Sequence, residues 1–145
     1  MLERWIHGLW PRPGRILLAE DDAELRALVA LSLRRDRHEV VELEDGEALF
    51  RYFESAALGD QRTPPPDLVV SDVRMPVFAG IDVLRALRDA AIDTPVILVT
   101  AFGDPEIQRT AFELDATFLA KPFTMESLRL TVSVILAGTF VDRAS

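Results

Sequence analysis

Short apolar runs recur along the chain, separated by longer stretches in which apolar residues return every three or four positions. A short run rich in Val, Ile and Leu is typical of a strand that is buried on both faces of a sheet. Runs of this kind predict five strands, at Arg15 to Ala19, His38 to Leu43, Leu68 to Val70, Val96 to Val99 and Thr117 to Ala120.

The stretches between these runs show the spacing of amphipathic helices. The predicted helices run from Leu25 to about Arg37, Ala48 to Phe53, about Gly80 to Ala90, Pro105 to Leu114 and about Met125 to Leu136. Gly138 is the expected stop of the last one. Strands that alternate with helices predict a parallel sheet covered on both faces. The expected fold is therefore α/β, a flavodoxin-like, doubly wound (βα)5 sheet of five strands in the order 2-1-3-4-5.

The remaining segments divide the chain into an N-terminal extension (residues 1–14), the α/β domain (residues 15–138) and a C-terminal tail (residues 139–145). Apolar residues at helical spacing predict a short amphipathic helix in the extension: Leu2, Trp5, Ile6, Leu9 and Trp10. We expect this helix either to pack on its own domain or to form a dimer contact or docking patch. The stretch from Leu58 to Pro66 is polar and proline-rich and predicts an exposed loop.

Composition narrows the function classes. The 145 residues carry a formal net charge of −8, which argues against direct nucleic-acid binding by this chain. There are no cysteines and only two histidines, His7 and His38, which argues against thiolate chemistry, a histidine metal site and a catalytic triad. No apolar stretch approaches the roughly 20 residues that cross a bilayer, and no signal peptide is evident. We therefore expect a cytoplasmic protein without membrane contact.

Polar residues that could take part in binding or catalysis follow the predicted strands. Glu20 and Asp21 follow the first strand, Asp72 the third, Thr100 the fourth and Lys121 the fifth. In open parallel sheets, ligands bind beyond the carboxyl ends of the strands, so these side chains are expected to converge at one edge. Each also has a structural interpretation as a helix cap or a solvated strand end, but their joint occurrence at four strand ends favours a site.

The expected site combines clustered carboxylates with a cation and an ammonium group. Carboxylates about 4 Å apart repel each other by about 4 kcal/mol per pair at an effective dielectric near 20. Mg²⁺ relieves this repulsion, with Asp21 as a direct ligand, Glu20 acting through water and the backbone carbonyl of Arg74 as a further ligand. Lys121 adds positive charge beside Asp72. Asp72 is then a plausible nucleophile for phosphoryl transfer, and the Thr100 hydroxyl can donate to an incoming oxygen.

The same residues also have structural interpretations. Asp21 with Glu24 matches a capping box, and Asp22 can itself cap the first helix. Lys121 can be a solvated strand-end lysine, and Thr100 can cap the loop that follows it.

These motifs resemble the receiver domain of two-component response regulators. The matching segments are Ile16–Leu17–Leu18–Ala19–Glu20–Asp21–Asp22, Asp72–Val73–Arg74–Met75–Pro76, Val99–Thr100–Ala101 and Lys121–Pro122–Phe123. The resemblance covers about Arg15 to Leu136. It implies Mg²⁺-dependent phosphorylation of Asp72 by a sensor histidine kinase or a histidine phosphotransfer protein. Any enzymatic activity would be limited to self-phosphorylation and self-dephosphorylation.

The resemblance also implies a switch and an output. Thr100 is the switch hydroxyl, and Phe118 holds the aromatic switch position, although a simple core position is its structural alternative. The signalling face would combine the helix from Pro105, the strand Thr117 to Ala120 and the last helix. It would contact a downstream protein or a fused output domain, or form a homodimer, for which the N-terminal helix is the other candidate.

The sequence departs from the family pattern at two turns. Ala79–Gly80 stands where the family often has Asp-Gly, and Asp115–Ala116 stands where it often has Gly-Ala. Asp115 must therefore adopt a backbone geometry that glycine accommodates more easily.

Three other functions compete with this interpretation. Phosphatases with an aspartyl nucleophile typically carry a second aspartate two residues later, where this chain has Arg74. A flavodoxin-like FMN carrier needs a phosphate loop after the first strand, and Glu20–Asp21–Asp22 would repel a phosphate. A receiver-like protein-binding module that works without phosphorylation stays open as the alternative.

Overall fold

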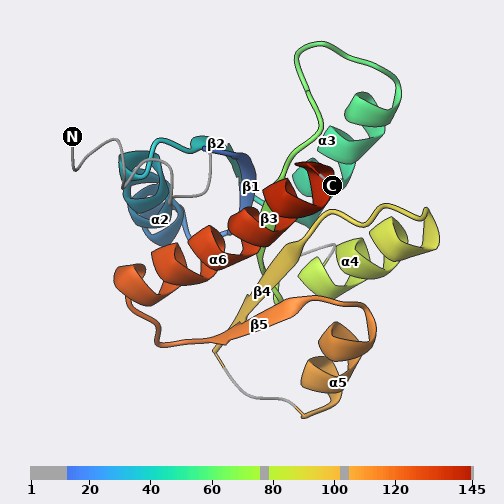
Figure 1. Cartoon of the computed structure of the whole chain (residues 1–145). Helices are drawn as coiled ribbons and strands as arrows, with labels where there is room; N and C mark the ends of the chain where they lie inside the picture. The colour runs from blue at the N-terminus through green and yellow to red at the C-terminus, as the bar shows by residue number, and fades with distance from the viewer. Residues whose placement is uncertain (1–12, 76–78, 102–104, 145) are drawn as a thin grey trace, which may run out of the picture.

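The computed structural model describes residues 13–75, 79–101 and 105–144. The strands of the described residues run parallel in one sheet (Figure 1). They are β1 Arg15–Ala19, β2 Glu39–Leu43, β3 Leu68–Asp72, β4 Val96–Thr100 and β5 Thr117–Ala120, and their order is β2-β1-β3-β4-β5. This confirms the predicted doubly wound α/β fold.

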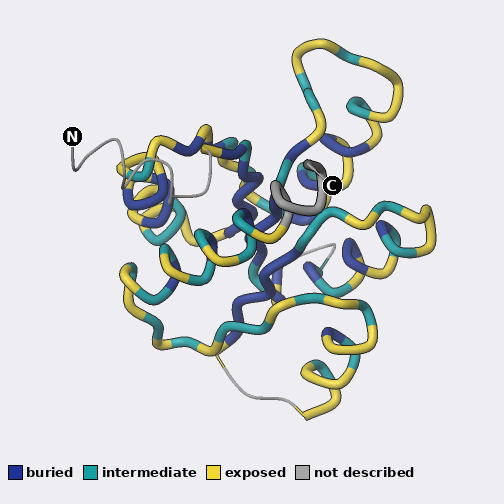
Figure 2. The backbone as a smooth tube through the Cα atoms, viewed as in Figure 1, coloured by how far each residue is buried: buried dark blue, intermediate teal, exposed yellow. Residues whose placement is uncertain are grey.

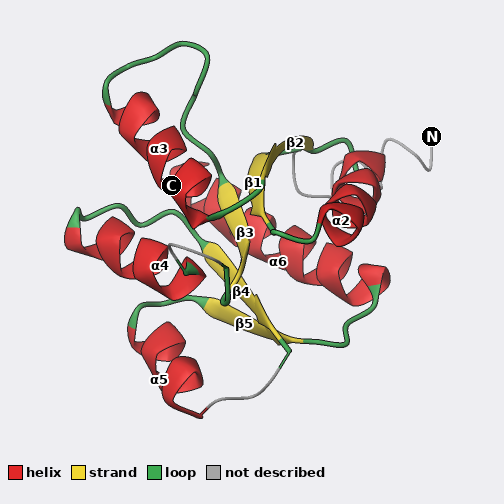
Figure 3. Cartoon of the chain, turned by 180° about the vertical axis from the view of Figure 1, so that it is seen from behind, coloured by secondary structure: helices red, strands yellow, loops and turns green. Residues whose placement is uncertain are grey.

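Helices cover both faces of the sheet. They are α2 Ala23–Arg35, α3 Gly46–Ala57, α4 Gly80–Asp89, α5 Pro105–Glu113 and α6 Met125–Ala144. α2 and α6 lie on one face, and α3, α4 and α5 lie on the other (Figures 1 and 3). Neighbouring residues of β1 show the two layers, because Ile16 packs with α2 and α6 whereas Leu17 packs with α3 and α4. The strands β1, β3 and β4 form the buried centre of the molecule, whereas the edge strands β2 and β5 are partly exposed (Figure 2).

The parallel register brings the carboxyl ends of the strands to one edge. Ala19 of β1 is paired with Ser71 of β3, and the next residue, Asp72, is paired with Val99 of β4. Thr100 is in turn paired with Ala120 of β5. The polar residues that follow β1, β3, β4 and β5 are therefore neighbours in space, as expected for a doubly wound sheet.

Asp22 is the N-cap of α2, which gives it a different role from Glu20 and Asp21 before it. Its side chain accepts hydrogen bonds from the backbone N–H groups of Glu24 (3.0 Å) and Leu25 (3.1 Å), which satisfies two donors of the first turn. Because Asp22 is the cap, the alternative capping role of Asp21 is wrong.

Several predicted boundaries differ from the structure. The expected stop at Gly138 is wrong, because α6 continues to Ala144, through the segment predicted as a tail. No atom lies within 4 Å of a Cβ built at Gly138, so nothing in the described residues prevents the helix from passing this position. β2 begins at Glu39 rather than His38, whose buried ring accepts a hydrogen bond from the Gly14 N–H (3.1 Å).

The predicted N-terminal helix, with Trp5 and Trp10, lies outside the described residues. Asp115 adopts the left-handed backbone predicted for it, with φ of 56°. Within residues 13–75, 79–101 and 105–144, no helix combines the length and the apolar character needed to span a bilayer.

Candidate phosphoacceptor site

Asp72 is the last residue of β3, and its side chain is only 12% exposed. The chain beyond it is held to β4, because the Val73 N–H donates to the Val99 carbonyl (2.9 Å). The Arg74 N–H donates to Asp72 Oδ1 (2.9 Å), which fixes the carboxylate relative to its own loop. Asp72 is thus a partly accessible carboxylate in a defined orientation.

Two further carboxylates meet Asp72 at this edge. Carboxylate oxygens of Glu20, Asp21 and Asp72 all lie within 4.8 Å of one another. Glu20 is buried and Asp21 is exposed, so the cluster reaches from the interior to the surface. The structure therefore brings together the three acids that the strand-end pattern predicted.

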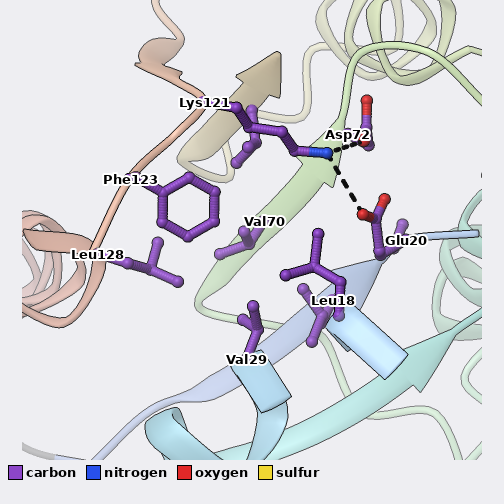
Figure 4. A pocket seen from close by; sticks show the side chains of 11 residues that line it. Leu18, Glu20, Val29, Val70, Asp72, Lys121, Phe123 and Leu128 are labelled. Carbon is purple, nitrogen blue, oxygen red and sulfur yellow. Dashed lines mark hydrogen bonds and ion pairs between the residues drawn. The ribbon is translucent and has the colours of Figure 1, made fainter. Parts of the chain in front are cut away.

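Lys121 completes the cluster from the end of β5. Its Nζ lies 2.7 Å from Asp72 Oδ2 and 3.4 Å from Glu20 Oε1 (Figure 4). The backbone N–H of Lys121 donates to the Thr100 carbonyl (2.6 Å), which anchors the lysine to the end of β4. The ammonium group consequently bridges two acids that come from different strands.

The charges of the cluster are only partly balanced. The pKa of Glu20 is raised to about 7: burial is the largest cause, the hydrogen bond with Asp72 and the Asp72 charge also raise it, and Lys121 lowers it. Burial lowers the pKa of Lys121, but the hydrogen bond to Asp72 and the charges of both acids outweigh this and raise it overall. Lys121 therefore stays charged, whereas the ionised form of Glu20 is disfavoured.

One buried carboxylate oxygen of the cluster has an unsatisfied hydrogen-bonding capacity within the described part of the chain. Glu20 Oε2 is buried and has no hydrogen-bond partner among the described residues. A buried carboxylate oxygen without a partner is costly, and a hard divalent cation would satisfy it. The three side-chain donors of the cluster are carboxylate oxygens, and one of them, Asp21, is exposed, which fits Mg²⁺ with retained water ligands.

The two predicted switch residues lie on β4 and β5. Thr100 is buried at the end of β4, next to the site through its carbonyl contact with Lys121. Phe118 is half-buried on β5 and is paired with Leu98, two residues before Thr100. The site and Phe118 are thus linked through the backbone of two adjacent strands.

The close approach of Gly80 to the Asp72 backbone was not predicted from the sequence. A Cβ at Gly80 would lie 2.3 Å from the Asp72 carbonyl oxygen and 2.7 Å from Ser71 Oγ, so only glycine fits there. The signal was present as a glycine at the start of a predicted helix, but its contact with β3 depends on tertiary structure. An apolar crevice beneath the lysine was also not predicted; its lining includes Leu18, Val29, Val70, Phe123 and Leu128 (Figure 4).

A doubly wound parallel sheet with three acids, a threonine and a lysine at its carboxyl edge defines the class of two-component signalling domains. The family model of the response regulator receiver domain matches residues 16–133, and the chain belongs to this family.

Similar proteins agree with this assignment. The chain is 36% identical over 118 residues to the alkaline phosphatase synthesis transcriptional regulatory protein SphR of Synechococcus elongatus. The aligned region covers 79% of this chain and 46% of that protein. The chain is also 36% identical over 124 residues to the regulatory protein VanRB of Enterococcus faecalis, which covers 84% and 52%. The chain spans about half the length of the curated relatives it matches.

A solved structure shows the same fold. It is the signal receiver domain of a putative Luxo repressor protein from Vibrio parahaemolyticus, with a TM-score of 0.80 and 25% identity. The match covers 92% of this chain and 97% of that one.

Proposed function

We propose that this receiver domain accepts a phosphoryl group on Asp72 from a histidine kinase or a histidine phosphotransfer protein, in a Mg²⁺-dependent reaction. The observation that carries the proposal is the contact of Asp72 Oδ2 with Lys121 Nζ (2.7 Å) inside a three-carboxylate cluster. A carboxylate that is held by an ammonium group and stays 12% exposed can be reached by a donor.

In the proposed reaction, one carboxylate oxygen of Asp72 attacks the phosphorus atom of a phosphohistidine. A P–O bond forms while the P–N bond breaks, and the imidazole nitrogen leaves with the electron pair. Glu20, Asp21, Asp72 and the Arg74 carbonyl would hold Mg²⁺, which supplies positive charge beside the phosphoryl oxygens when it is bound. Lys121 would supply further positive charge at the acceptor, since its Nζ contacts both Asp72 and Glu20.

Thr100 and Phe118 would report phosphorylation to the surface. The Thr100 hydroxyl would donate to the new phosphoryl group, and Phe118 would turn inward with it. The output face would be formed by α5, β5 and α6. Large apolar side chains are exposed on both helices of that face, with exposed fractions of 81% for Phe112, 65% for Leu130 and 64% for Val134.

Such a face suits contact with a downstream protein, with an output domain of the same protein, or with a second copy of the chain.

The direct test is phosphorylation with a small phosphodonor and Mg²⁺, followed by intact mass. Wild type should gain the mass of one phosphoryl group, and Asp72→Asn should gain none. Asp89→Asn is the matched control, because Asp89 is exposed at the end of α4, away from the site, and should behave as wild type.

Two results would contradict the proposal. Phosphorylation that persists in Asp72→Asn would place the acceptor elsewhere. A wild-type chain that binds the cation yet stays unmodified by phosphodonors and by a histidine phosphotransfer protein would support a binding module that works without phosphorylation.

A further inference from the structure

The outer surface of α2 carries two leucines that the described fold does not cover. Leu28 and Leu31 are 52% and 53% exposed and are three residues apart, so they lie near each other on the helix surface. The buried face of the same helix is formed by other residues, including Val29, Ala30 and Leu33. α2 therefore has a second apolar patch outside its core face, and we call Leu28 and Leu31 the α2 patch.

The N-terminal extension enters the fold beside this helix. The Gly14 N–H donates to His38 Nδ1 (3.1 Å), and the Gly14 carbonyl accepts from the Glu39 N–H (3.0 Å), just after the end of α2. On its other side, a Cβ at Gly14 would lie 3.2 Å from Leu136 Cδ1 of α6. The segment that precedes β1 thus passes between the carboxyl end of α2 and the helix α6.

The extension has the length and the pattern to cover the α2 patch. The nine residues from Leu2 to Trp10 would span about 14 Å as a helix, and Leu31 and Leu28 lie about 8 and 12 Å along α2 from its C-cap, Asp36. The sequence predicts one apolar stripe in this segment: Leu2, Trp5, Ile6, Leu9 and Trp10. Pro11, Pro13 and Gly14 lie between the stripe and β1 and allow a change of chain direction.

We propose that residues 1–12 fold back on their own domain and pack their apolar stripe against the α2 patch. The short tether favours this partner over a second copy, because tethering gives an effective concentration in the millimolar range. The inference does not depend on phosphorylation of Asp72, so either proposal can fail without the other.

Tryptophan fluorescence tests the proposal directly, because both tryptophans of the chain, Trp5 and Trp10, lie in the extension. In the full-length chain we expect blue-shifted emission and weak acrylamide quenching, both independent of protein concentration. In Leu28→Glu/Leu31→Glu, the emission should shift to the red and the quenching should approach that of the denatured chain. Far-UV circular dichroism checks that the variant is folded, which is expected because both leucines are half exposed.

The matched control is Leu130→Glu/Val134→Glu. It places the same charges on α6, which covers the same face of the sheet, at residues that are 65% and 64% exposed. Its tryptophan emission should equal that of wild type. A red shift in this control but not in the α2 variant would mean that the extension packs on α6, and would overturn the proposal.

A second measurement leaves the α2 patch intact. The chain has no cysteine, so Arg35→Cys on α2 carries one energy acceptor, and Glu113→Cys on α5 is the control on the opposite face. We expect efficient transfer from the tryptophans to position 35 and weaker transfer to position 113. Equal transfer to both positions, wild-type emission like that of the denatured chain, or a blue shift that appears only as the chain dimerises would each overturn the proposal.

Discussion

Glu20 is a buried acid of the site, and keeping it ionised costs free energy of folding. It is 5% exposed, its Oε2 has no partner among the described residues, and its pKa is raised to about 7, first by burial and then by Asp72. Its folded-state pKa lies above the ordinary value of 4.5, so the folded chain binds this proton more tightly than the unfolded chain does. The stabilisation is complete below pH 4.5 and is lost as the pH rises through 7.

We therefore predict that, without divalent cations, the free energy of unfolding falls as the pH rises from 4.5 to above 7. The contribution of Glu20 is on the order of 3 kcal/mol at most. Urea unfolding at several pH values measures it. Glu20→Gln should flatten the pH dependence over this window, and an unchanged slope in that variant would refute the assignment.

Gly80 matters for a different reason, because its role is purely steric. A Cβ there would lie 2.3 Å from the Asp72 carbonyl oxygen, which is a backbone atom of β3 and cannot move aside freely. We predict that Gly80→Ala lowers the free energy of unfolding by about 1–3 kcal/mol.

Denaturant unfolding of both glycine variants checks this. Gly138→Ala is the control, since its Cβ would meet no described side chain or neighbouring element within 4 Å and the residue lies inside α6. It should be neutral or stabilise by up to about 1 kcal/mol through helix propensity. A Gly80→Ala chain as stable as wild type would show that β3 and α4 are not in close contact.

At the scale of elements, α5 is held by few contacts. Ala111 is the buried residue of this helix, and most of the surface of α5 is exposed (Figure 2). Arg88 of α4 secures its carboxyl end, because its Nε donates to the Leu114 carbonyl (2.8 Å). The same guanidinium donates to the carbonyls of Ile92 (2.7 Å) and Thr94 (3.0 Å), so it connects α4, the loop before β4 and the end of α5.

We predict that Arg88→Met lowers the free energy of unfolding by about 2–4 kcal/mol, because three carbonyls lose a charged donor. Amide hydrogen exchange should also rise at the carboxyl end of α5. Arg85→Met is the control, as Arg85 is exposed on the same helix and should change stability by less than about 0.5 kcal/mol. Equal effects of the two substitutions would rule out the connecting role of Arg88.

For the whole molecule, a cation that binds at the acid cluster would link binding to folding. The formal net charge is −8, and three of the carboxylates lie within 4.8 Å of one another. A cation that binds the folded chain stabilises it, by about 2.7 kcal/mol at a hundredfold excess over its dissociation constant. We expect Mg²⁺ to raise the thermal midpoint relative to a chelator.

Asp21→Asn should lose most of this Mg²⁺ effect. Asp22→Asn is the matched control, because it removes the neighbouring charge but keeps a good N-cap for α2. If Mg²⁺ stabilises Asp21→Asn as strongly as Asp22→Asn, the cation binds outside the predicted cluster.

Much of the fold and of the candidate site could be predicted because the signals are local. β3 was recognisable as a short apolar run, and Asp72 as the polar residue that ends it. Helix ends were harder, as α6 passes Gly138 where a stop was expected. A glycine ends a helix only when the chain needs to turn there, and that need does not lie in the neighbouring residues.

The sequence by itself determined the alternation of strands and helices, the strand order and the residues at the carboxyl edge of the sheet. It could do so because apolar spacing and the limited topologies of parallel sheets are enough to specify them. Only the tertiary structure decided that Asp22 caps α2 while Asp21 joins the cluster, that Gly80 touches Asp72 and that Arg88 holds the end of α5. These facts depend on which atoms meet across elements distant in sequence, and no periodicity encodes those meetings.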